Sequence, residues 1–185
     1  MQRRALARFH AARIEGEMKH ASNIPEMVAL EMERGYITET EELEDYLREV
    51  ADRHREIYGS CIAFKPFGFR RDLRGYAPYF YRAKDGLEFV QLANPDYNYF
   101  QWDWYRRPRD LGRAVWTEPY FVEGGGNVIM ISYSVPFRRE GQFWGIATCD
   151  IAMPQFIAET EKIRVGETGY AFIVSRSGKY LAYPD

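Results

Sequence analysis

The chain changes character near residue 57, and this change limits its fold more than any other feature. Before that point, apolar residues recur three or four positions apart among many charged ones, which is the period of an amphipathic helix. Residues 2–34 therefore predict one long helix, or two helices in line. Pro25 is expected to kink or restart it, because proline lacks a backbone donor and clashes with the preceding turn. Gly35 is the expected end of this helix.

A second helix and a series of short strands are expected to follow. Thr38 and Glu41 have the spacing of a capping box, which would open a helix that runs to about Ile57. Later segments rich in β-branched and aromatic residues predict strands, with a hairpin turn at 138–141 and a short helix at 154–164. The helices come first and mainly antiparallel strands follow, and this order is typical of an α+β fold. The predicted strands are Ser60–Phe64, Tyr76–Arg82, Val115–Tyr120, Asn127–Phe137, Gln142–Ile151, Tyr170–Ser175 and Lys179–Tyr183.

Composition sets few further limits. Contents of 46% hydrophobic and 28% charged residues describe an ordinary globular chain, and a net charge of -2 gives no overall attraction to nucleic acid. No apolar run approaches the roughly 20 residues that span a bilayer, and residues 1–35 lack the apolar centre of a signal peptide. The last predicted hairpin would be marginal by itself, so we expect the chain to be a piece of a longer protein.

The sequence contains no group of residues with the spacing of a catalytic or metal site. His10, His20 and His54 form no HxxxH or HExxH pair. Ser132 and Ser134 have no nearby histidine and lie in no GxSxG motif. We therefore expect that the protein is not an enzyme and uses no cofactor.

The two cysteines are expected to be free. Cys61 and Cys149 fall in separate predicted strands and match no zinc-ligand spacing. Side chains at strand centres rarely meet the geometry of a disulfide, so the sequence predicts two buried thiols.

Ten residues hold an unusual concentration of aromatic rings. Residues 99–108, YFQWDWYRRP, contain five rings, one acid and two arginines. A hydrophobic core needs rings but does not need an acid between two tryptophans, whereas a binding site often uses both. Rings beside arginines also suit single-stranded nucleic acid, but Asp96, Asp103 and Asp110 in the same patch argue against that partner.

Three segments resemble the double Cache family of bacterial extracytoplasmic sensor domains. They are WDWYRRPRDLGRAVWTEPYFVEGGGNVIMISYSVPF, GIATCDIAM and GYAFIVSRSGKYLAYP, and the resemblance covers about Tyr58–Asp185. It implies a long helix packed on PAS-like antiparallel sheets. It also implies a ligand-sensing input domain of a transmembrane receptor whose output is a histidine kinase, chemotaxis transducer, cyclase or phosphatase. The implied location is the cell membrane, with the domain facing the periplasm or exterior.

The resemblance also implies a division of the chain. Residues 1–35 would form a helix that rises from the membrane, residues 36–165 the membrane-distal module that holds the ligand, and residues 166–185 the start of a membrane-proximal module. The charged N-terminal helix permits a parallel homodimer.

The same family supplies the candidate ligand site. Members that bind amino acids share a motif of Tyr, then Arg-x-Trp-Tyr, then a later Tyr and an Asp. Trp102 stands where the motif has its arginine, so the bidentate clamp for a carboxylate is missing. We therefore expect an amine, a methylated ammonium or a small polar metabolite ahead of a free amino acid, because a buried carboxylate favours a cation and aromatic faces attract one. The candidate ligand-binding residues are Tyr97, Trp102, Trp104, Tyr105, Tyr120, Tyr133 and Asp150.

Two other interpretations of these residues stay open. The rings would equally fill the core of a structural or dimerisation module that binds no ligand. An aromatic cleft also suits a hydrolase, although the sequence shows neither a nucleophile nor a base for one.

Overall fold

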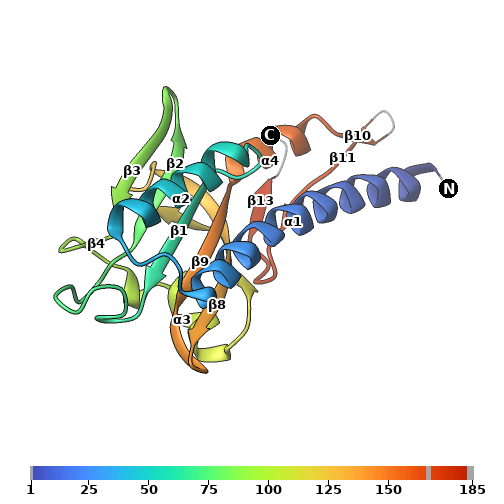
Figure 1. Ribbon diagram of the computed structural model, residues 1–185. Coiled ribbons are helices and arrows are strands. Elements are labelled where there is room, and N and C mark those ends of the chain that lie inside the picture. Colours follow the sequence, from blue (N-terminus) through green and yellow to red (C-terminus); the bar gives the residue numbers. More distant parts are fainter. Residues whose placement is uncertain (1, 166–167, 183–185) are drawn as a thin grey trace.

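The computed structural model describes residues 2–165 and 168–182. Two helices, α1 (Gln2–Arg34) and α2 (Thr40–Arg53), precede the strands of one large antiparallel sheet. These strands are β1 (Gly59–Phe64), β2 (Pro78–Ala83), β3 (Gly86–Gln91), β6 (Val115–Trp116), β7 (Tyr120–Val122), β8 (Val128–Arg139) and β9 (Gln142–Ala152). Six of the seven strands lie in the order β3-β2-β1-β9-β8-β6, and the seventh, β7, also pairs with β8 (Figure 1). The α+β fold with a long N-terminal helix is thus confirmed.

Shorter elements lie between β3 and β6 and after β9. They are β4 (Ala93–Asn94), β5 (Tyr97–Asn98), the 3-10 helix η1 (Tyr99–Gln101), α3 (Asp103–Leu111), α4 (Met153–Glu161), β10 (Arg164–Val165), β11 (Gly169–Tyr170), β12 (Ile173–Val174) and β13 (Tyr180–Ala182). β12 and β13 form the predicted terminal hairpin, and β13 packs against α4.

The two faces of the sheet are covered by different elements. Because side chains alternate along each strand, neighbouring residues contact different sets of these elements. On β9, Ala147 and Cys149 face the side that carries α1 and α2, whereas Ile146 faces the side that carries η1 and α3. The helices contact different strands: α1 packs on β8 and β9, and α2 packs on β1 and β2.

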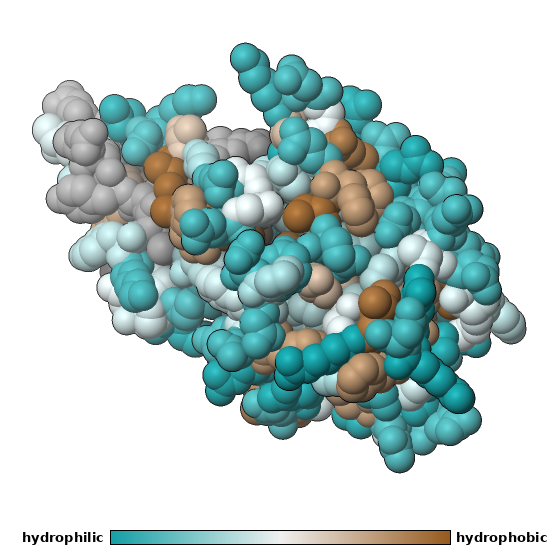
Figure 2. All heavy atoms as spheres, turned by 90° about the vertical axis from the view of Figure 1, so that its left-hand side faces the viewer, coloured by the Kyte–Doolittle hydropathy of each residue, from teal (hydrophilic) through white to brown (hydrophobic). Residues whose placement is uncertain are grey.

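The side of the molecule with β3 and β4 is mainly hydrophilic. Figure 2 shows hydrophobic residues there in small separate groups that are surrounded by hydrophilic ones. Scattered apolar residues of this kind are ordinary on a soluble surface.

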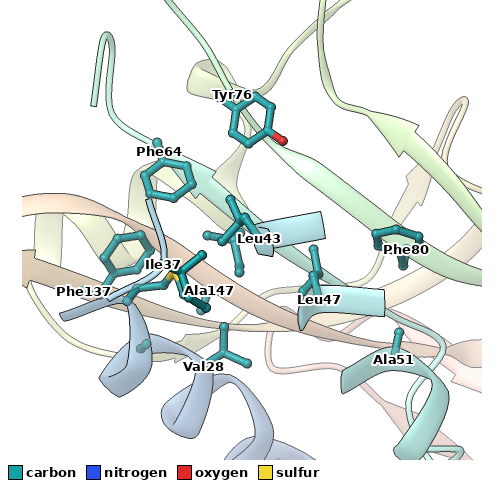
Figure 3. Close-up of a cluster of buried hydrophobic side chains, with 13 residues drawn as sticks. Val28, Ile37, Leu43, Leu47, Ala51, Phe64, Tyr76, Phe80, Phe137 and Ala147 are labelled. Atoms are coloured by element: carbon teal, nitrogen blue, oxygen red, sulfur yellow. The ribbon is translucent and has the colours of Figure 1, made fainter. Parts of the chain in front are cut away.

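The largest buried cluster lies between the two helices and the sheet (Figure 3). Leu43 and Leu47 on α2 are fully buried, and Val28 contributes from α1. From the sheet, the rings of Phe64 and Phe137 meet edge to face, with their centroids 5.6 Å apart. Burial of these apolar groups is what fixes both helices on the same face of the sheet.

Helix α1 runs without interruption through Pro25, so the predicted restart of the helix there is wrong. Proline cannot donate to the carbonyl four residues earlier, and that carbonyl, of Ala21, instead accepts a hydrogen bond from the Cys149 thiol on β9 (3.2 Å). The bond satisfies the freed carbonyl and ties α1 to the sheet. Gly35 follows the helix with φ of 72°, as predicted. Both Cys61 and Cys149 are free and buried, which confirms that prediction.

Helix α2 differs from its prediction at both ends. Its N-cap is Glu39, whose side chain makes no capping hydrogen bond, so the capping box predicted from Thr38 is wrong. The helix stops at Arg53 rather than near Ile57. The reason is a long-range contact that the local sequence does not contain.

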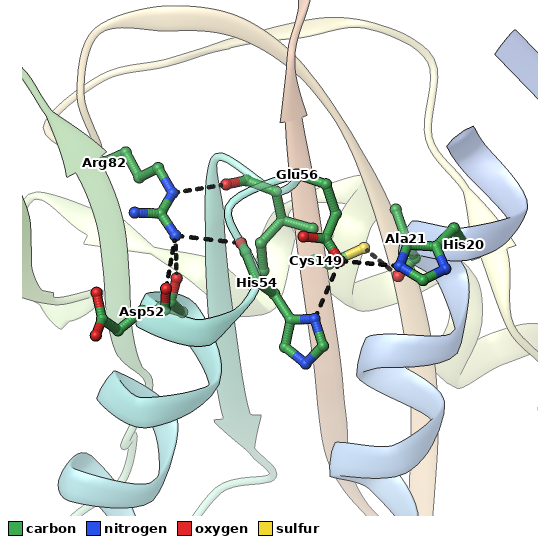
Figure 4. Close-up of polar contacts among 9 residues, drawn as sticks. His20, Ala21, Asp52, His54, Glu56, Arg82 and Cys149 are labelled. Carbon is green, nitrogen blue, oxygen red and sulfur yellow. Dashed lines mark hydrogen bonds and ion pairs between the residues drawn. The ribbon is translucent and has the colours of Figure 1, made fainter.

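That contact is made by Arg82, which extends from β2 toward the end of α2 (Figure 4). Its guanidinium donates hydrogen bonds to four backbone carbonyls at and beyond the last turn. These are the carbonyls of Ala51, Asp52, His54 and Ile57. A cation at the C-terminus of a helix also interacts favourably with the helix dipole.

A nearby carboxylate joins the two helical segments. Glu56 Oε1 lies 3.2 Å from Nε2 of His20 on α1 and 3.0 Å from Nδ1 of His54 (Figure 4).

The β8–β9 hairpin is confirmed, including its turn. Glu140 and Gly141 both have positive φ, 51° and 75°, which is the requirement of a type I′ turn. The strand predicted over 115–120 is instead two strands, β6 and β7, which pair with β8 on either side of the segment 117–119. β3 was not predicted.

Candidate functional site

A small cavity lies between the sheet and the segment that contains η1 and α3. Trp104, in the first turn of α3, points to the sheet and donates from Nε1 to the Tyr97 hydroxyl at 3.0 Å. Both side chains are buried. The cavity lining consists of Cys61, Tyr79, Leu92, Tyr97, Trp104, Tyr120, Val122, Met130, Thr148 and Asp150.

Asp150 supplies the only carboxylate among the described residues that line this cavity. It stands on β9 opposite Ser132 of β8, which donates from Oγ to Asp150 Oδ1 at 2.5 Å. The Tyr120 hydroxyl lies 2.7 Å from the same Ser132 Oγ. A chain of hydroxyls thus leads from the aromatic wall to the acid.

Burial makes the Asp150 carboxyl a weaker acid than usual. Removal from water raises the pKa of Asp150 to about 6, while the hydroxyls of Ser132 and Tyr79 oppose that shift. Tyr79 is buried, and its hydroxyl has no hydrogen-bond partner of full geometry among the described residues. At neutral pH a carboxyl with this pKa is mostly ionised, and a buried carboxylate and a buried hydroxyl with incomplete hydrogen bonding are both costly. The site therefore gains from a group that would satisfy both of them.

The cavity is small. Its volume is about 10 Å³, which is close to the least that holds one water molecule. A larger guest requires the surrounding rings to move.

Four of the seven predicted residues meet at this cavity: Tyr97, Trp104, Tyr120 and Asp150. Trp102 lies beside it. Its ring stacks on Tyr97 with centroids 5.2 Å apart, lies 6.1 Å from the Tyr120 ring and is half-buried.

Tyr105 and Tyr133, the remaining two predicted residues, do not line this cavity. The hydroxyl of Tyr105 donates to the Phe64 carbonyl at 3.4 Å, and its ring meets Phe143 edge to face, so it packs the core. Tyr133 is next to Ser132 on β8 and therefore faces the opposite side of the sheet, where its hydroxyl donates to Glu26 on α1.

Sequence reasoning missed Tyr79 and Ser132 as lining or supporting groups. Ser132 was considered only as a nucleophile, and Tyr79 was taken as an ordinary strand residue. Alternation along the predicted strand Tyr76–Arg82 would have placed Tyr79 and Tyr81 on one face, but not next to Asp150.

Two features are not found among the described residues, a cluster of metal-binding side chains and a membrane-spanning helix. Within residues 2–165 and 168–182, no three His, Cys, Asp or Glu side chains gather as a metal would require. None of the helices described is both apolar and long enough to span a bilayer.

An antiparallel sheet with a long helix on one face and a small aromatic cavity with a buried acid on the other defines a sensor domain of the PAS-like Cache class. The chain belongs to the family described as methyl-accepting chemotaxis protein-like, first PDC sensor domain, whose model matches residues 43–158. The predicted role as an extracytoplasmic ligand-sensing input domain is thereby confirmed.

Known proteins agree with this assignment. The methyl-accepting chemotaxis protein PctB of Pseudomonas aeruginosa is 31% identical over 90 residues, which are 49% of this chain and 14% of that receptor. The chain thus spans less than a fifth of the curated relatives that it matches.

Solved structures match over more of the chain. The extracellular domain of the putative histidine kinase mmHK1S-Z3 has a TM-score of 0.82 and 28% identity, over 93% of this chain and 65% of that one. The ligand-binding domain of the Pseudomonas aeruginosa amino acid chemoreceptor PctC, in complex with GABA, has a TM-score of 0.69 and 20% identity, over 98% of this chain and 74% of that one. At 20% identity, the similarity to PctC is a similarity of fold.

Proposed function

We propose that the cavity at Asp150 is the ligand site of a receptor input domain, and that it takes a small molecule with an amine or a methylated ammonium group. The observation that carries this proposal is the buried Asp150 carboxyl beside the Tyr79 hydroxyl, which has no partner of full geometry among the described residues. A cationic donor would stabilise the ionised carboxylate and would also donate a hydrogen bond to the Tyr79 hydroxyl oxygen.

The walls of the cavity support the same ligand class. Tyr97, Trp104 and Tyr120 offer aromatic faces or edges, and a cation gains roughly 0.5 to 2 kcal/mol from each well-placed ring when water is excluded. Trp102 adds a further ring where an arginine would bind a carboxylate. PctC, crystallised with GABA, shows that a related fold holds a molecule that carries an amine.

The receptor context is part of the proposal. Residues 1–35 would rise from a membrane, 36–165 would form the membrane-distal ligand-binding module, and 166–185 would begin a membrane-proximal one, with the domain in the periplasm or exterior. The output would be a chemotaxis transducer or a histidine kinase, and the domain itself would have no enzyme activity. A parallel homodimer through α1 would place two such inputs side by side.

Calorimetry on the purified domain tests the ligand class. Methylammonium, choline, putrescine and GABA would be titrated, with succinate as the carboxylate without an amine. We expect at least one amine to bind and succinate to give no heat. Asp150→Asn should weaken amine binding by at least about 30-fold, because it removes the charge of a buried pair. Asp103→Asn, on the exposed start of α3, is the matched control and should bind as the wild type does.

Circular dichroism and a thermal melt would first establish that Asp150→Asn is folded. Trp102→Arg should move preference toward GABA and succinate, since it restores a guanidinium. Tight binding of succinate by the wild type, with all amines inert, would show that the ligand class is wrong. Absence of any response to amines and to carboxylates would favour a structural module.

A further inference from the structure

A second cavity lies on the opposite face of the sheet, where α1, α4, β12 and the β6–β8 ladder meet. Its volume is about 440 Å³, well above that of the cavity at Asp150 and within the range of about 300 to 1,000 Å³ that small-molecule sites occupy. In Figure 1, α1, α4 and β13 all lie on this side of the sheet.

The floor of this second cavity is aromatic and apolar. Trp116 on β6 and Tyr133 on β8 are half-buried, and their ring centroids are 4.9 Å apart. Met18 from α1, Phe156 from α4 and Ile173 from β12 form the walls. Ring faces that are open to a cavity of this size offer a flat surface on which a planar apolar group would stack.

The rim carries an excess of positive charge. Arg107 on α3, Arg113 before β6 and Arg176 in the β12–β13 turn come from three separate segments and line the same cavity. Among the described residues, none of the three makes an ion pair or a side-chain hydrogen bond. Glu118 is the acid that lines this space within the described chain, and it accepts a hydrogen bond from the Ser177 hydroxyl at 2.8 Å.

Three guanidinium groups that have no ion-pair partner among the described residues lie near a pair of aromatic rings, and together they define the chemistry of a guest. A guanidinium presents a planar fork that pairs with a carboxylate through two hydrogen bonds. A cleft lined by one sign of charge also raises the local concentration of the opposite ion. A neutral guest would provide no anion to pair with the arginines, and a cation would be repelled by them.

We propose that this second cavity binds an organic carboxylate with an aromatic or apolar body, separately from the amine at Asp150. The carboxylate meets the arginines at the rim, and the body lies on Trp116 and Tyr133. Because the cavity is bounded by α1, by the sheet and by β12, such a guest contacts both the long helix and the terminal hairpin. It would therefore act on the packing of these elements without entering the Asp150 cavity.

Phenylacetate and phenethylamine are suitable probes, since both carry a phenyl ring on a short chain and they differ in charge. Each would be titrated into the domain while the intrinsic tryptophan fluorescence and the heat are followed. We expect phenylacetate to bind saturably and phenethylamine to leave this cavity empty. The double variant Arg113→Glu/Arg176→Glu should weaken phenylacetate binding by at least about 10-fold, because both charges are reversed.

Two controls separate this site from the other one. Arg106→Glu reverses an exposed charge on α3 that does not line the cavity, so it should leave phenylacetate binding unchanged. Asp150→Asn should also leave it unchanged, whereas it should weaken amine binding by at least about 30-fold. The proposal fails if phenylacetate does not bind, if the double variant binds it as well as Arg106→Glu does, or if Asp150→Asn removes its binding.

Discussion

Asp150 combines two properties that rarely occur together in a folded protein. It is 4% exposed, and it is ionisable with a pKa of about 6. Ser132 and Tyr79 moderate the cost of its burial without removing it. A group of this kind is more often found at a functional site than in a core that serves stability alone.

This acidity predicts how stability depends on pH. The pKa of Asp150 rises from its ordinary 3.8 to about 6 on folding, so the folded protein holds the proton more tightly than the unfolded chain does. Its contribution to stability is therefore lost as pH rises from about 4 to about 6. Between pH 5 and pH 7, we expect the free energy of unfolding of the wild type to fall by about 1 kcal/mol relative to that of Asp150→Asn.

Urea unfolding of both proteins at the two pH values measures this difference. Other titrating groups are common to both proteins and cancel in the comparison. An equal pH dependence in the wild type and the variant would mean that Asp150 is solvated in the folded state.

At the level of single residues, sequence reasoning identified the aromatic residues of the cavity and Asp150, but it did not identify Ser132 as the partner of Asp150. Counted outward from the turn, Arg138 pairs with Phe143, which would set Asp150 opposite Ile131. A bulge next to Arg138 shifts the register, and Ser132 stands opposite Asp150 instead. Bulges depend on packing across the whole sheet, so neither the site partner nor the opposite facing of Tyr133 followed from the motif alone.

At the scale of elements, the end of α2 shows what local patterns lack. Helical periodicity gave the existence of both helices correctly, since apolar spacing records which face is buried. The end of α2 is instead fixed by Arg82, which is 31 residues from Ala51 along the chain. A cap that comes from such a distance leaves no mark in the sequence around the helix.

Replacing this cap should have a measurable cost. In Arg82→Met, the methionine retains an apolar stem, but the carbonyls of the last turn lose their charged donor. We expect the free energy of unfolding to fall by about 2 kcal/mol, because hydrogen bonds to charged groups contribute about 1.5 to 3 kcal/mol each and water will replace some of them. Lys84→Met, an exposed cation two residues away, should change stability by less than about 0.5 kcal/mol. Chemical denaturation of both variants gives the comparison, and equal losses would exclude the capping role.

At the scale of the whole molecule, one strand connects the candidate ligand site to the long helix. Asp150 faces the cavity, and its neighbour Cys149 faces α1 and donates to the Ala21 carbonyl that Pro25 leaves free. Burial raises the pKa of the Cys149 thiol, which keeps it protonated as a donor. A displacement of β9 caused by a ligand at Asp150 would therefore also displace Cys149 and its hydrogen bond to α1.

The same helix carries the surface expected for a homodimer. Met27 and Leu30 are 54% and 52% exposed on α1, and Phe9 is 64% exposed nearer its start. Helical spacing sets Met27 and Leu30 side by side. Analytical ultracentrifugation should find a dimer that Met27→Glu/Leu30→Glu shifts to monomer, whereas Phe89→Glu, at an exposed apolar position on β3, should not. A wild type that is monomeric at every concentration would rule this interface out.

The small volume of the Asp150 cavity has a consequence in time. Because it holds no more than about one water molecule, a ligand at the proposed site would enter only after Trp104, Tyr97 or a neighbouring ring had moved. When ligand is abundant, the rate of binding at the proposed site would then be limited by how often the protein opens. Under that condition, changes in ligand concentration that are briefer than the opening interval would not be detected, and the domain would respond to the average concentration over its opening time.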